Sequence, residues 1–231
     1  MFEDNILYED DSIIVINKPP YFPVQSAKLT RPDCVSALKN LIKERDGVKG
    51  EPYIGLIHRL DEPVEGIMVF AKNKNAASVL SKELTEGGFS KEYTAAVILG
   101  DDDPPEKGEL TDMILTDRKT NMSSVVPAGT KGAKEAKLEY SAGEEHILAD
   151  GMRIRLLKVL LYTGRHHQIR VQLANAGMPI AGDRKYAKAC SGLPLCLAAT
   201  GLSFDHPSSG KRLTYSLRPA FIEKIISAGQ S

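Results

Sequence analysis

The sequence predicts an α+β fold with a mixed, largely antiparallel central sheet and flanking helices. Predicted strands occur in runs with fewer helices among them, and strands and helices do not alternate regularly. In residues 152–162, Arg153 and Arg155 alternate with apolar side chains, which is typical of a sheet with one exposed face. The chain has 231 residues, 42% of them hydrophobic, and no repeat or interdomain linker is apparent. We therefore expect a single domain over residues 1–231.

The first third of the chain mixes strands and helices. A helix is expected over 34–45, because Val35, Leu38 and Ile42 recur at helical spacing after Asp33, which can cap it. The other expected elements are a strand and a turn within 6–12, strands at 13–18 and 67–71, and a helix at 76–86 that Asn75 caps and Gly87-Gly88 end.

The rest of the chain is richer in strands. A strand is expected at 91–99 and an acidic surface loop at 100–108, whereas residues 109–130 show no pattern that predicts an element. The further expectations are strands at 136–142 and 152–162, a helix at 166–176, a turn-rich return at 178–183, a hairpin of 195–204 with 211–217, and a helix at 220–227.

Charge is unevenly distributed along the chain. Residues 151–188 carry eight basic side chains against one acid, a net charge of +7, although the whole chain sums to zero. The rest of the chain therefore carries −7, and a basic segment in an otherwise acidic chain fits a phosphate-rich ligand bound on one side. A mixed, solvated surface is the alternative.

Several classes of protein are disfavoured. No apolar run is long enough to span a bilayer, and the acidic N-terminus does not resemble a signal peptide, so we expect a cytoplasmic protein. The three cysteines, Cys34, Cys190 and Cys196, form no metal-type pair and are expected to be small buried hydrophobes. Phosphate-binding loop, dinucleotide and serine-hydrolase motifs are missing, and adjacent His166 and His167 do not face each other on a helix. We expect neither a cofactor nor a metal.

Three polar clusters could carry chemistry: His58–Asp61, Lys91–Tyr93 and Thr163–Arg170. A carboxylate can attack or abstract, an arginine can pair with it, and an aromatic ring can stack on a flat base. Each has a simpler interpretation. Asp61 could pair with an arginine at a turn, Tyr93 could be core packing, and the arginines could be solvated.

Taken together, these clusters resemble the RluA-type family of RNA pseudouridine synthases. The His-Arg-Leu-Asp box leads through Gly66 into a strand that ends in Ala-Lys, and a Lys-x-Tyr strand begins at Lys91. A Thr-Gly-Arg-x-His-Gln-Ile-Arg run at 163–170 precedes a Gly-x-Pro-Ile-x-Gly-Asp segment at 177–183. The opening Asn17-Lys18-Pro19 also matches. The resemblance covers nearly the whole chain and implies the pseudouridine synthase fold with a catalytic cleft.

The resemblance also implies roles for individual residues. Asp61 would be the essential carboxylate, Arg165 would pair with it, Tyr93 would stack on the uracil, and Arg59 would fill the gap left by an everted base. The remaining implied residues are Ile169 and Arg170 at the substrate, and Arg153, Arg155, Arg184 and Lys185 at the RNA backbone.

The implied partner is RNA, either ribosomal or transfer RNA, bound by a monomer that requires no protein partner and no membrane. No N-terminal S4 domain is expected, because the first strand begins almost at residue 6. The sequence departs from the family at Val64-Glu65, where relatives often have Thr-Ser, and at Gln172, where they often have His. A catalytically inactive RNA-binding protein with the same fold, and a glycosidase-like hydrolase acting on nucleosides, are the alternatives.

Overall fold

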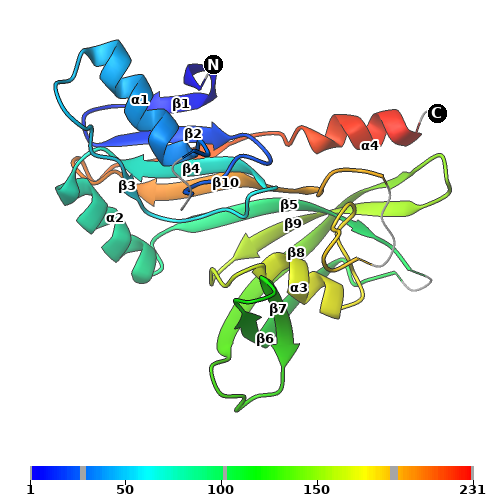
Figure 1. Cartoon of the computed structure of the whole chain (residues 1–231). Coiled ribbons are helices and arrows are strands. Elements are labelled where there is room, and N and C mark those ends of the chain that lie inside the picture. Colours follow the sequence, from blue (N-terminus) through cyan, green and yellow to red (C-terminus); the bar gives the residue numbers. More distant parts are fainter. Residues whose placement is uncertain (1, 27–29, 101–102, 188–191, 230–231) are drawn as a thin grey trace. The chain divides into compact units, whose positions relative to one another are not determined.

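The computed structural model describes residues 2–26, 30–100, 103–187 and 192–229. The chain divides into two compact units, one of Met1–Ser90 with Ala199–Leu217 and one of Lys91–Ala198 with Arg218–Ser231. Figure 1 shows the helices and strands of both units. The architecture is α+β with largely antiparallel strand pairing, as the sequence predicts.

The sheet of the first unit has the strand order β1-β2-β4-β10, with β3 paired to β4 and β11 paired to β10. Strands β2 and β4 pair antiparallel, with Ile13 opposite Ala71 and Lys18 opposite Gly66. Every residue of β4 is buried, which explains the apolar run from Ile67 to Ala71 that follows Glu65 and Gly66. The strands are β1 (Ile6–Glu9), β2 (Ile13–Lys18), β3 (Gly55–Leu56), β4 (Glu65–Ala71), β10 (Leu197–Asp205) and β11 (Arg212–Ser216), preceded by a 3₁₀ turn at Glu3–Asn5.

Two α-helices belong to the first unit, α1 (Cys34–Asp46) and α2 (Lys74–Thr85). As predicted, Asp33 caps α1: its side chain accepts from the Ser36 N–H, and the Ser36 side chain accepts from the Asp33 N–H. The predicted cap of α2 is wrong by two residues. Asn73, not Asn75, has the extended backbone of a cap and accepts from the Ala76 N–H at 2.9 Å.

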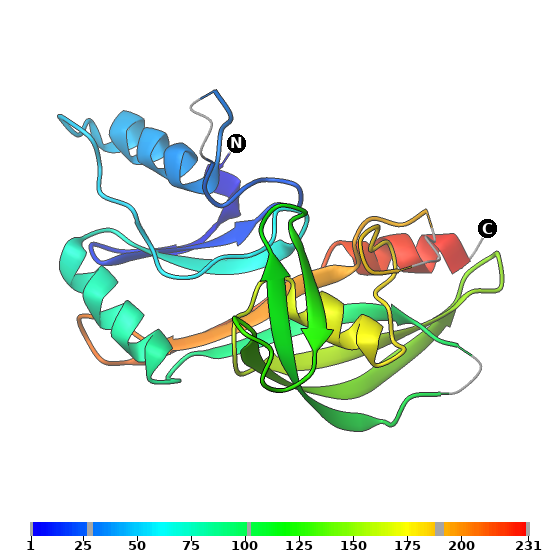
Figure 2. The same ribbon diagram turned by 60° about the horizontal axis from the view of Figure 1, so that its bottom comes forward.

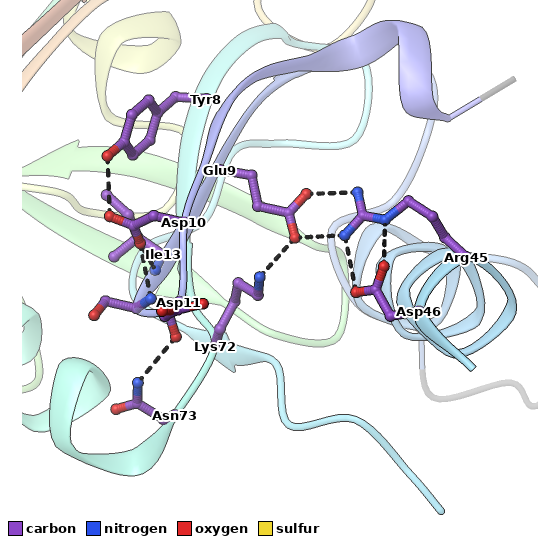
Figure 3. A network of polar contacts seen from close by, with 10 residues as sticks. Tyr8, Glu9, Asp10, Asp11, Ile13, Arg45, Asp46, Lys72 and Asn73 are labelled. Carbon is purple, nitrogen blue, oxygen red and sulfur yellow. Dashed lines mark hydrogen bonds and ion pairs between the residues drawn. The ribbon is translucent and has the colours of Figure 1, made fainter. Parts of the chain in front are cut away.

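A network of ion pairs ties the edge strand β1 to α1 and to the end of β4 (Figure 3). The Glu9 carboxylate accepts from both terminal nitrogens of Arg45 at 2.8 Å and from Lys72 Nζ at 2.6 Å. Asp46 binds the same guanidinium from within α1, with its Oδ1 2.7 Å from Arg45 Nε. The core of this unit is built mainly from side chains of β2, β4, α2 and β10.

The sheet of the second unit has the strand order β5-β9-β8-β6-β7, with antiparallel pairing throughout. Strands β8 and β9 pair along most of their length, with one irregularity between Ala142 and Glu145. The strands are β5 (Ser90–Ile98), β6 (Lys107–Asp117), β7 (Met122–Val126), β8 (Lys134–Ile147) and β9 (Arg153–Leu161).

Helix α3 (Gln168–Asn175) packs against the β6–β7 hairpin, as Figure 2 shows, and α4 (Phe221–Gly229) packs against β8. The sequence predicts that α3 begins at residue 166, but His167 has a φ of +55°, so the helix starts only at Gln168. Gly177, the predicted stop, has a φ of +78°.

Most other expected elements are confirmed, including the hairpin of β10 and β11. The β6–β7 hairpin is not predicted, and the expected loop at 100–108 is too long, because β6 already begins at Lys107. Residues 101–102 of that loop lie outside the described residues. Cys34 and Cys196 are buried free thiols, as expected, whereas Cys190 is not among the described residues. No helix in the described ranges is long and apolar enough to cross a membrane.

Candidate active site

Asp61 lies in the loop between β3 and β4 of the first unit. The chain runs extended to this residue and then turns, since the Val64 N–H donates to the Asp61 carbonyl at 3.0 Å. Leu60 and Val64, on either side of the turn, are buried, with 8% and 2% of their surfaces exposed. Asp61 itself is half-buried. The loop therefore holds the Asp61 backbone firmly while leaving its side chain partly accessible.

A buried lysine at the end of β2 is hydrogen-bonded to this loop. Lys18, at the end of β2, is fully buried, and its Nζ donates to the carbonyls of Pro19 and Phe22 at 2.8 Å and of Glu62 at 3.1 Å. Burial lowers the pKa of Lys18 to about 8, against the opposing effect of nearby negative groups that include Asp61. The structure thus places a positive charge near Asp61 that the sequence, read residue by residue, does not single out.

Gly66 allows β4 to approach β10 closely. Its φ is +138°, and a Cβ at this position would lie 2.3 Å from the Ala199 carbonyl oxygen. A side chain here would force the two strands apart. The glycine of the first motif therefore has a packing reason that is separate from any chemistry.

The neighbours of Asp61 have different surroundings. His58 Nε2 accepts a hydrogen bond from the Val69 N–H at 3.3 Å. The centre of its ring lies 6.3 Å from the centre of the Phe89 ring in an edge-on arrangement, so His58 holds the loop against β4. Arg59 is exposed, and no ion pair involving it is found among residues that the structure describes.

Tyr93, Arg165 and Ile169 lie in the second unit. Tyr93, on β5, is 8% exposed and pairs with Val159 of β9. Arg165 is exposed, and its Nε donates to the Glu135 carbonyl at 2.8 Å. Ile169, in the first turn of α3, is 4% exposed.

The turn that carries Arg165 is organised by Gln168. Its Oε1 accepts from the Thr163 hydroxyl at 2.7 Å and from the Arg165 N–H at 3.0 Å, while its Nε2 donates to the Lys137 carbonyl at 3.1 Å. One buried amide side chain therefore fixes both ends of the turn to β8. This explains the glutamine of the third motif without a direct role in chemistry.

Arg170 is buried rather than solvated. Its Nε and Nη2 donate to the two Asp183 oxygens at 2.8 and 2.7 Å, and its guanidinium lies 5.2 Å from the centre of the Tyr186 ring. Burial alone raises the pKa of Asp183, but the hydrogen bonds and charge of Arg170 lower it below its ordinary value. This ion pair joins α3 to the following segment. A contact of Arg170 with substrate stays a prediction.

The arginines predicted to contact the RNA backbone fall into two groups. Arg153 and Arg155 both bind Glu145, at 2.8 and 2.7 Å, and Asp103 lies within ion-pair distance of both. Their charge is therefore largely compensated. Arg184 and Lys185 are exposed, and Lys185 Nζ donates to the Asn121 carbonyl at the tip of the β6–β7 hairpin.

A Ser-His-Asp chain in the first unit does not form a hydrolytic site. The Ser209 hydroxyl lies 3.0 Å from His206 Nδ1, and His206 Nε2 lies 2.7 Å from Asp10 Oδ2. However, the Nδ1 atom already accepts from the backbone N–H groups of Ser208 and Ser209, at 3.3 and 3.1 Å. His206 thus caps the turn between β10 and β11 and is not poised as a general base. Across the described ranges, no group of His, Cys, Asp and Glu residues could hold a metal ion.

Comparison with known proteins points to one family. Residues 12–175 match the family model described as RNA pseudouridylate synthase. An uncharacterised RNA pseudouridine synthase of Bacillus subtilis is 32% identical over 217 residues, which is 91% of this chain and 67% of that protein. The ribosomal large subunit pseudouridine synthase D of Vibrio cholerae is 32% identical over 91% of this chain and 66% of its own length. The chain thus spans about two thirds of these relatives.

Solved structures show the same fold. The human protein RNA pseudouridylate synthase domain containing 4 superimposes with a TM-score of 0.79 and 24% identity, over 99% of this chain and 94% of that one. At this identity the likeness establishes the fold alone. The matched fold agrees with the one implied by the three sequence motifs.

Proposed function

Because the chain belongs to the RNA pseudouridylate synthase family, we propose that it isomerises uridine to pseudouridine in RNA with Asp61 as its essential carboxylate. The observation that carries the proposal is the family match over residues 12–175, which includes Asp61, Tyr93 and Arg165. The anchored, partly accessible loop of Asp61 supports it.

The reaction exchanges one bond of the ribose C1′ atom for another. The bond from C1′ to uracil N1 breaks, the base turns within the site, and a bond from C1′ to C5 forms. The hydrogen of C5 leaves as a proton, and N1 gains one. Water is not consumed and no electrons are exchanged. One carboxylate can suffice, because uracil leaves as a delocalised anion and stays bound, whereas glycoside hydrolases use a pair.

Two mechanisms are possible for the Asp61 carboxylate. Its oxygen attacks C1′ to form a covalent sugar adduct, or it removes a ribose proton to give a glycal. In both routes Arg165 would pair with the Asp61 carboxylate and hold its orientation, and Tyr93 would stack on the uracil. Arg59 would occupy the space that the everted uridine leaves in its stack. Ile169 and Arg170 would complete the substrate-binding residues.

The RNA substrate is proposed to be ribosomal or transfer RNA, and the named substrate class of the Vibrio cholerae relative, the large ribosomal subunit, supports the former. Arg153, Arg155, Arg184 and Lys185 are proposed to contact phosphates. We further propose a cytoplasmic monomer that forms one functional catalytic domain and needs no protein partner, cofactor or metal.

The proposal is tested by mapping pseudouridine in total RNA with carbodiimide sequencing in a deletion strain and its parent. A mark that is lost in the deletion strain should return with the wild-type gene and not with Asp61→Asn. Glu62→Gln, which removes the neighbouring carboxylate, is the matched control and should restore the mark. An identical map in both strains, or full rescue by Asp61→Asn, would contradict the proposal.

The alternatives are separated by their products. A catalytically inactive RNA-binding protein would leave every uridine unchanged in purified reactions while still binding RNA. A nucleoside hydrolase would release free uracil, which an isomerase does not. Family membership supports the isomerase over both.

A further inference from the structure

A half-buried lysine at the start of β5 stands beside the turn that carries Arg165. Lys91 begins the second unit, and its Nζ lies 3.9 Å from the position that a Cβ on Gly164 would occupy. Gly164 and Arg165 are both exposed. The Lys91 ammonium therefore lies next to an accessible stretch of backbone that has no side chain to cover it.

This ammonium has no partner in the described part of the chain, where neither a hydrogen bond nor an ion pair of Lys91 Nζ is found. Three other buried or half-buried cations do have partners: Lys18 binds three carbonyls, Lys72 binds Glu9, and Arg170 binds Asp183. Lys91 differs from them, because its half-buried ammonium loses part of its hydration and gains no partner in the described part of the chain.

The nearest charge makes the environment of Lys91 worse. Burial lowers the pKa of Lys91, and the positive charge of Arg165 lowers it further. A cation of β5 and a cation of the neighbouring turn thus lie close together. An anion from outside the protein would relieve both the desolvation of Lys91 and the repulsion between the two side chains.

The strand geometry relates Lys91 to the predicted stacking residue. Lys91 and Tyr93 are two residues apart on β5, so their side chains leave the same face of the sheet, with Cα atoms about 6.6 Å apart. Both side chains are therefore on the side of β5 that a base stacked on Tyr93 would occupy.

We propose that Lys91 binds a backbone phosphate of the RNA next to the uridine whose base stacks on Tyr93. The inference rests on the proposed function, to which it adds an anion site. Arg165 lies beside this site, with its Nε bound to the Glu135 carbonyl. A phosphodiester fits because it is an anion that an RNA substrate supplies at every nucleotide, and a lysine binds it as a point charge.

The test measures binding of fluorescein-labelled oligouridine by anisotropy at several salt concentrations. Lys91→Met keeps the aliphatic stem and removes the charge, Lys91→Arg keeps the charge, and Lys74→Met removes an exposed lysine of α2 as the matched control. Plots of log K against log salt concentration have a negative slope, and loss of one phosphate contact on a single strand makes that slope shallower by about 0.7. Near 0.1 M salt this corresponds to about fivefold weaker binding. We expect this change for Lys91→Met alone.

A thermal unfolding measurement separates binding from folding. Because Lys91 has no partner to lose, Lys91→Met should unfold at the same temperature as the wild type or higher. A markedly lower midpoint, or a salt slope unchanged from that of the wild type, would overturn the anion site.

Failure of the proposed function gives a different result. Suppose that the wild type forms no pseudouridine in unmodified RNA, yet Lys91→Met still binds oligouridine with a salt slope shallower by about 0.7. The anion site then stands and the isomerase proposal falls. If the wild type is active and the Lys91→Met slope is unchanged, only the anion site falls.

Discussion

Replacing Lys18 by methionine should change how the stability of the protein depends on pH. The Lys18 ammonium is fully buried and is held by three carbonyls, one of them the carbonyl of Glu62 beside Asp61. Its pKa falls from 10.5 to about 8 because burial disfavours the charged form. In the unfolded chain this lysine returns to water and to its ordinary pKa.

The sign follows from proton binding. Between pH 8 and 10.5 the unfolded chain binds more protons at this lysine than the folded chain does, so the stability of the wild type rises with pH in that window. The cost of the charged lysine is fully present below the folded pKa and disappears as the pH approaches the unfolded pKa. For a shift of this size, the lysine should contribute a gain of about 2.5 kcal/mol between about pH 7 and about pH 10.

Urea unfolding curves of the wild type and Lys18→Met over this pH range test the prediction. The free energy of unfolding of the wild type, minus that of the variant, should grow by the predicted amount as the pH rises. Loss of the three hydrogen bonds adds a constant offset but no slope. Lys74→Met, which removes an exposed lysine, should parallel the wild type. If Lys18→Met also parallels the wild type, the lysine is not desolvated and the description of the anchor is wrong.

Three further substitutions test other parts of the structure. Gly66→Ala should destabilise the protein by about 3 kcal/mol, because its Cβ would meet the Ala199 carbonyl oxygen at 2.3 Å and φ is +138°; an unchanged urea midpoint would contradict the close strand approach. Arg170→Met should cost about 3–5 kcal/mol in unfolding free energy by leaving the Asp183 carboxylate buried and unpaired, and a loss below about 1 kcal/mol would show that the pair is not structural. Tyr93→Phe should keep most pseudouridine-forming activity and Tyr93→Ala should lose about 1–3 kcal/mol of RNA binding, whereas inactivity of the phenylalanine variant would assign the hydroxyl a chemical role.

Strong local patterns made much of the fold predictable from the sequence. The buried apolar runs of β2 and β4, and the spacing of Leu38 and Ile42 on α1, predict the elements that form the core of the first unit. The β6–β7 hairpin escapes prediction because it is mostly solvated. In β6, only Ile114 is buried, and the apolar residues Leu110, Met113, Ile114 and Leu115 do not alternate regularly with polar ones.

The site is less readable from local patterns, because its supporting contacts join distant residues. In the sequence, Lys18 has the pattern of a polar residue at the end of a strand. Only folding brings its Nζ to the carbonyl of Glu62, which lies 44 positions further along the sequence. Arg170 likewise reads as a solvated residue, because Asp183 reaches it only after α3 and the following turn have formed. The motif residues Asp61, Tyr93 and Arg165 are recognised by resemblance, and their roles remain predictions.

The central claim is that the Asp61 carboxylate performs the isomerisation. The most direct measurement is a time course of pseudouridine formation by purified wild type, Asp61→Asn and Glu62→Gln on unmodified RNA, with RNA binding measured in parallel. Asp61→Asn should form no pseudouridine yet bind RNA with near-normal affinity, while Glu62→Gln stays active. Turnover by Asp61→Asn at the wild-type rate would contradict the assignment.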